Sequence, residues 1–112
     1  MSAPFDAAAL LASMHGDRAA VAEMLRLCLE IDAPRLLGAL RAARERKDLA
    51  AMQDAAHGIK GLAGELSASI CFRSADDLEE SAREHRLNAS LQLGAELERE
   101  FLRLCEALQR IG

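Results

Sequence analysis

The chain has 112 residues, the size of a single domain with one hydrophobic core, so we expect one domain over residues 1–112. Leucine and alanine dominate the apolar content, and 3% of the residues are aromatic, a composition that favours helices. The net charge is −4, and arginine and lysine are scattered among acidic residues. This charge pattern argues against binding to nucleic acid or to an anionic membrane surface.

Cys28, Cys71 and Cys105 are widely spaced and lie among apolar neighbours, as buried free thiols do. Their spacing fits no zinc site, and we expect no bound metal. The chain opens without a signal segment, and no apolar run reaches the roughly 20 residues of a membrane span. We therefore expect a reduced, cytoplasmic setting. We also expect a monomer.

Apolar residues recur at helical spacing along the whole chain and predict five helical segments. The segments begin near Asp6, Arg18, Asp48, Ser67 or Ser69, and Asn88 or Ser90. Pro34 interrupts the second segment, which either continues to Arg46 as one kinked helix or divides into two helices. Because the connections are short and no segment alternates like a strand, we predict an all-α, up-and-down four-helix bundle with a short additional N-terminal helix.

The third segment carries a histidine in an unusual setting. Its apolar stripe consists of Leu49, Met52, Ala56, Ile59, Ala63 and Leu66. His57 lies about 100° around the helix from this stripe, so we expect its ring on the flank or in solvent. Gln53, Lys60, Gly61 and Gly64 share its face. Glycine costs roughly 1 kcal/mol in a helix, which indicates that bare backbone is needed there for the approach of another molecule.

A helical histidine is most often a surface residue, and the string HxxKG is weak by itself. Here the off-core position, the nearby cation and the glycines together favour a nucleophilic imidazole. Neutral imidazole can attack an activated phosphoryl group, and the Lys60 ammonium can then lie beside the phosphoryl oxygens as a mobile point charge. The sequence has neither an ATP-binding glycine loop nor an acidic cluster for magnesium. The other half of such a site must therefore come from a partner.

Residues 56–68 read AHGIKGLAGELSA and residues 75–79 read ADDLE, close to a pattern of AHxLKGxAGxLGA followed by AxxLE. In these features the chain resembles the histidine-containing phosphotransfer (HPt) domain family of two-component phosphorelays. Residues 27–37 also resemble the stretch that precedes the family's kinked second helix, so the resemblance extends from about Phe5 to the C-terminus.

The resemblance implies that His57 is the phosphoryl acceptor, that Lys60 steadies the phosphoryl group, and that Gly61 permits receiver docking. Gln53 and Gly64 are expected on the same docking face. The implied partners are receiver domains of a hybrid histidine kinase or of response regulators. The receiver would supply Mg²⁺, while this chain would have no cofactor and no kinase activity of its own. The expected protein is a freestanding phosphorelay intermediate.

Ser67 and Gly58 depart from the family pattern. Ser67 replaces a usual glycine and could act as an N-cap, whereas the sequence offers no reason for Gly58 in place of threonine or serine. Glu79 resembles a position that orients the histidine ring in some members, but a solvated surface acid is the alternative that we favour from the sequence.

Two other functions stay open as alternatives. A module of the same fold could bind and sequester a response regulator without relaying phosphoryl groups. An enzyme or metal-carrying bundle would need inward carboxylates or a Glu-x-x-His pair, which the sequence lacks. His15 and His85 are expected near helix ends and in solvent.

Overall fold

Helices make up all the regular structure of residues 4–111, the part of the chain that the computed structural model describes. In chain order they are α1 (Ala7–Ser13), α2 (Arg18–Leu27), the π-helical turn η1 (Cys28–Asp32), α3 (Ala33–Glu45), α4 (Leu49–Glu65), α5 (Ser69–Arg83) and α6 (Leu87–Ile111). This arrangement confirms the all-α prediction.

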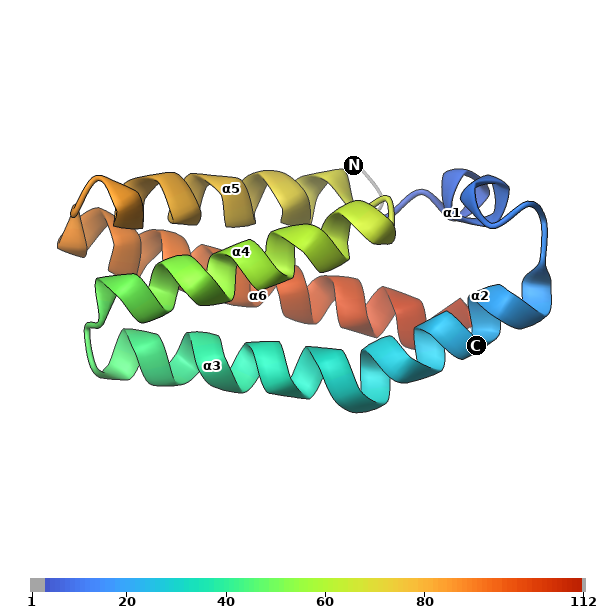
Figure 1. Cartoon of the computed structure of the whole chain (residues 1–112), viewed down its shortest axis with the longest axis horizontal. Coiled ribbons are helices and arrows are strands. Elements are labelled where there is room, and N and C mark those ends of the chain that lie inside the picture. Colours follow the sequence, from blue (N-terminus) through green and yellow to red (C-terminus); the bar gives the residue numbers. More distant parts are fainter. Residues whose placement is uncertain (1–3, 112) are drawn as a thin grey trace.

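Four long helical runs form an up-and-down bundle (Figure 1). Around the bundle, α3 packs against α4, α4 against α5, α5 against α6, and α6 against α3. The short helix α1 lies at one end of the bundle and contacts α2. The backbone N–H of Asp6 donates to the carbonyl of Ser67 at 2.9 Å, which ties the start of α1 to the turn between α4 and α5.

The second predicted segment is one continuous helical run, in which η1 joins α2 to α3. Pro34 has no N–H to donate to the preceding turn. Directly before it, the N–H of Ala33 donates to the carbonyl of Cys28, five residues back. This π-helical turn accommodates the proline, which donates no backbone hydrogen bond. The helical run therefore bends at this point but does not end.

Aspartate side chains cap three helices. Asp6, Asp17 and Asp48 each accept from the backbone N–H three residues further on, at 3.0 Å. The suggested N-cap role of Ser67 is wrong, because Ala68 precedes α5 without a side-chain cap. Ser67 instead follows the end of α4 in the left-handed conformation, with φ of +55°. Glycine adopts this conformation without strain, which explains why the family pattern has glycine at this position. α6 also begins one residue before the earliest predicted start.

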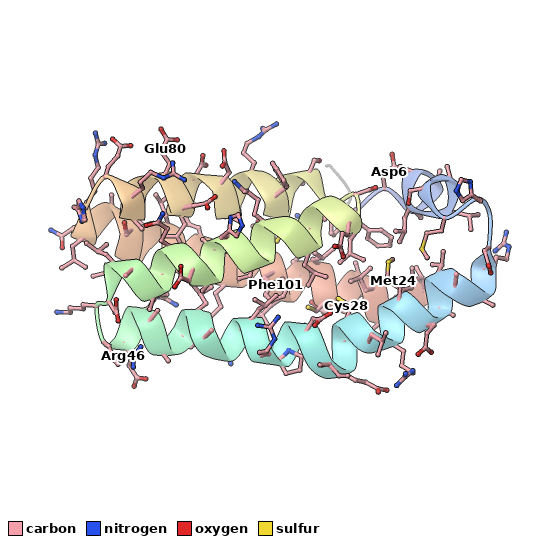
Figure 2. The ribbon with its side chains drawn as sticks, in the orientation of Figure 1. Asp6, Met24, Cys28, Arg46, Glu80 and Phe101 are labelled. Atoms are coloured by element: carbon pink, nitrogen blue, oxygen red, sulfur yellow. The ribbon has the colours of Figure 1, made fainter. Side chains whose placement is uncertain are left out.

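The core lies where the predicted stripe of α4 meets the other helices, and five of its six residues are buried. Figure 2 shows Phe101 of α6 inside the bundle, whereas Arg46 and Glu80 project outward.

Cys28 and Cys71 are buried free thiols, and burial raises the pKa of Cys28 to about 11 and that of Cys71 to about 12. Within residues 4–111, no helix combines the length and the apolar character needed to cross a membrane.

Gly58 has a packing reason that the sequence alone did not reveal. A Cβ atom at this position would lie 2.7 Å from Cδ2 of Leu36, a buried residue of α3. The absence of a side chain therefore lets α3 approach the histidine-bearing helix closely.

Candidate functional site

The ring of His57 projects from α4 into solvent, with 72% of the side chain exposed. This agrees with its predicted position off the apolar stripe. On its inner side, Nδ1 lies 2.8 Å from Oε2 of Glu79, which belongs to α5. One ring nitrogen is thus bound by the neighbouring helix, while the rest of the ring is free to meet another molecule.

Glu79 is buried, with 7% of its side chain exposed, so the interpretation as a solvated surface acid is wrong. Its other oxygen, Oε1, lies 2.6 Å from Nζ of Lys60. This contact has the distance of an ion pair but not the angles of a hydrogen bond. Arg83, one turn further along α5, places Nη2 3.7 Å from Oε2. Two cations therefore balance a carboxylate that burial would otherwise disfavour.

The contact with Lys60 is the main reason that the pKa of Glu79 lies below its ordinary value, and the contact with His57 also lowers it, against the opposing effect of burial. An ionised carboxylate can only accept hydrogen bonds. Nδ1 of His57 must therefore be the donor to Glu79. In a neutral ring this leaves the lone pair on Nε2, the outer nitrogen.

Lys60 is held in place rather than mobile, which corrects the expectation of a freely moving charge. Its ammonium contacts Glu79 and also Oδ1 of Asp76, at 3.2 Å, and 24% of its side chain is exposed. The contact with Glu79, followed by that with Asp76, raises the pKa of Lys60. Nζ also lies 6.0 Å from the ring centroid of Phe72, at the outer limit of a cation–π contact.

Sequence reasoning gave no role to Phe72, Asp76 or Arg83. With Glu79 they follow one another at spacings of four, three and four residues, which places them on one face of α5. All four contact α4 or the Glu79 carboxylate. The helical spacing was visible in the sequence, but the rotation of α5 against α4 was not.

The glycines of α4 leave open backbone near His57. Gly61 and Gly64 are both exposed, and a Cβ atom at Gly61 would have no neighbour within 4 Å. At Gly64 a Cβ atom would make ordinary contact with the ring of Phe72. Gln53 is half-buried one turn before His57 and lies outside the cluster of His57, Lys60, Asp76 and Glu79. The steric expectation for Gly61 is therefore compatible with the structure, while Gln53 gains no contact that gives it a role.

The cluster can present a neutral, oriented imidazole together with a cation one helical turn away. Those are the requirements for nucleophilic attack on phosphorus and for holding the resulting anion. Within residues 4–111, no three histidine, cysteine or acidic side chains are grouped so that they could hold a metal ion.

Comparison with known proteins agrees with this geometry. The chain is similar to the crystal structure of histidine-containing phosphotransfer protein B (HptB) from Pseudomonas aeruginosa PAO1, with a TM-score of 0.86 and 24% identity. The match covers 98% of this chain and 95% of that one, and it shows a shared fold. No curated protein sequence matches the chain. The profile of the Hpt domain matches residues 23–111, so the chain belongs to the Hpt family, the histidine-containing phosphotransfer domains of two-component phosphorelays.

Proposed function

We propose that His57 is the residue that carries the phosphoryl group and that Nε2 is its reacting atom. The observation that carries this proposal is the 2.8 Å contact between Nδ1 and Glu79, because it leaves the Nε2 lone pair on the exposed side of the ring. His15 and His85 lie in turns with positive φ and have no such carboxylate partner among the contacts of the described residues.

The proposed donor is the phosphorylated aspartate of a receiver domain. The Nε2 lone pair bonds to phosphorus while the P–O bond to the aspartate breaks, and the aspartate leaves as a carboxylate. The ring gains positive charge in this step because its Nδ1 proton stays in place. The adjacent Glu79 carboxylate balances that charge, and Lys60 is near enough to meet the phosphoryl oxygens after a change of side-chain conformation. Transfer to a second receiver is the reverse sequence.

The receiver is proposed to supply Mg²⁺, and docking to supply the in-line geometry. We propose docking over the exposed side of α4 around His57, Gly61 and Gly64, with Gln53 at its edge. Because the receiver is proposed to supply both the metal and the geometry, the purified protein is expected not to label itself with ATP. The proposed setting is the cytoplasm, which three free cysteines favour, and the proposed acting form is a monomer.

The test is to incubate the protein with a panel of phosphorylated receiver domains and to measure acid-labile, base-stable label. His57→Gln is the matched variant, since glutamine is a good helix former and the exposed ring contributes little packing. We expect label on the wild type, no label on His57→Gln, and unchanged helical circular dichroism for both.

Receiver binding, measured by titration calorimetry, separates the alternatives. Relay function predicts that His57→Gln still binds, because affinity depends on the surrounding surface. Label that persists in His57→Gln would place the site elsewhere. Tight receiver binding by a wild-type protein that no receiver labels would instead support a sequestering module.

A further inference from the structure

The ammonium of Lys60 is shared by two carboxylates before any phosphoryl group arrives. Oε1 of Glu79 lies 2.6 Å from Nζ, and Oδ1 of Asp76 lies 3.2 Å from it. The two acids are three residues apart on α5, so both face the same point on α4. A phosphoryl group on His57 must therefore compete for a cation whose charge is already balanced.

The two carboxylates differ in how easily they can give up Lys60. Glu79 is buried and also accepts from His57, so releasing the cation would leave a buried charge with less compensation. Asp76 is 52% exposed, and water can solvate its carboxylate as soon as the ion pair opens. Asp76 is consequently the partner that a phosphoryl group displaces.

We propose that Asp76 occupies the position beside the Lys60 ammonium that a phosphoryl group on His57 would otherwise take. Its competition for this cation shortens the lifetime of phosphohistidine. The inference rests on the proposed role of His57. Asp76 touches none of the reacting atoms and acts only through the position of the Lys60 ammonium. By competing for the cation, Asp76 lowers the stability of phosphohistidine. The phosphoryl group is therefore transferred more easily to the next receiver.

The direction of the effect follows from the hydrolysis step. A water oxygen bonds to phosphorus as the P–Nε2 bond breaks, the electron pair returns to Nε2, and inorganic phosphate leaves with the protons of the water. In the loose transition state the phosphoryl oxygens resemble those of metaphosphate and carry less negative charge than in phosphohistidine. A cation on those oxygens stabilises the starting state more than the transition state. Freeing Lys60 from Asp76 must therefore slow hydrolysis.

The experiment compares phosphohistidine lifetimes in Asp76→Asn and Asp77→Asn. Both variants remove one negative charge from adjacent exposed positions of α5, but Asp77 lies on the side that faces α6, in a hollow lined by Arg73, Glu96 and Arg99. Inorganic phosphoramidate loads the histidine, with ammonia as the leaving group, so no receiver is present and docking cannot contribute. Intact-mass measurements follow the decay, and His57→Gln run in parallel corrects for label on His15 and His85.

We expect Asp76→Asn to lengthen the lifetime roughly two- to fivefold, the scale of one solvent-screened ion pair, and Asp77→Asn to leave it unchanged. Asp76→Glu keeps the carboxylate and should behave like the wild type. In a Lys60→Met background, Asp76→Asn should have no further effect, since there is no cation to release. The difference should also shrink at high salt.

Three results would overturn the inference: a lifetime in Asp76→Asn equal to that in Asp77→Asn, a shorter lifetime, or an equal gain in the Lys60→Met background. The last result would mean that Asp76 acts on the phosphoryl group directly. If neither phosphoramidate nor a phosphorylated receiver labels the wild type above the level of His57→Gln, the proposed function itself is contradicted, which is a separate outcome.

Discussion

Nδ1 of His57 donates to Oε2 of Glu79 across 2.8 Å, from an exposed ring to a buried carboxylate. This relationship sets which ring nitrogen holds the proton and which one faces outward. It also couples His57 to Lys60, since the same carboxylate balances the lysine ammonium. The proposed nucleophile and its cation are thus both in contact with one side chain of the neighbouring helix.

Glu79→Gln should slow phosphoryl acceptance by roughly 10- to 100-fold, because a hydrogen bond to a charged group contributes about 1.5–3 kcal/mol. A glutamine amide can also donate to Nδ1, which would move the ring proton to Nε2 and block the lone pair. Rapid-quench labelling with a phosphorylated receiver measures the rate. The neighbouring exposed residue provides the control Glu80→Gln, and equal rates in the two variants would refute the positioning role.

Lys60→Ala should keep the fold and shorten the phosphohistidine lifetime by about two- to fivefold, because a cation is lost from beside the phosphoryl oxygens. Lys47→Ala is the matched control, since Lys47 lies in the turn between α3 and α4 and the charge change is identical. Decay of the label after removal of the donor gives the lifetime. Equal lifetimes in both variants would leave Lys60 with a structural role only.

Gly61→Gln should block transfer from a receiver while stabilising the fold by about 0.5–1 kcal/mol, since glutamine is the better helix former. Gly38→Gln in α3 is the control, because a Cβ atom there also meets nothing within 4 Å and Gly38 borders a hollow between α3 and α6, away from α4. Urea unfolding and receiver-dependent labelling report the two effects. A Gly61→Gln variant that is labelled as fast as Gly38→Gln would remove the glycine from the docking face.

Gly58→Ala should be less stable than Gly61→Ala by about 1–3 kcal/mol. Both changes gain helix propensity, but only the first forces a Cβ atom to within 2.7 Å of Leu36, in a packed core where added volume is costly. The free energies of unfolding in urea decide the comparison. Equal stability would show that Leu36 moves aside freely.

The ion pairs that Glu79 forms with Lys60 and Arg83 predict a loss of folding stability in acid. The pKa of Glu79 lies below its ordinary value of 4.5, so its contribution is complete above about pH 4.5 and is lost as the pH falls through the lower native-state value. In a His57→Gln background, the charged groups in contact with it are Lys60 and Arg83. There, the stability advantage of Glu79 over Glu79→Gln should shrink as the pH falls below about 4.5. An advantage independent of pH would contradict the shift.

Local pattern was sufficient for the bundle and for the position of His57, because apolar spacing within one helix determines which face is buried. It was insufficient for Glu79, whose burial depends on how α5 is rotated against α4. The same limit applied to Gly58, which is explained by Leu36 of another helix, and to Asp76, which gains significance only beside Lys60. Contacts between helices decided each of these features.

His57, Lys60, Asp76 and Glu79 all belong to α4 and α5, and His57 and Glu79 are 22 residues apart in sequence. The whole cluster therefore assembles when a single helical hairpin closes, at a small loop-closure cost. The remaining helices need only supply an apolar backing of the right shape. Substitutions confined to those helices can then alter the remaining surface while the proposed phosphoryl site keeps its own contacts.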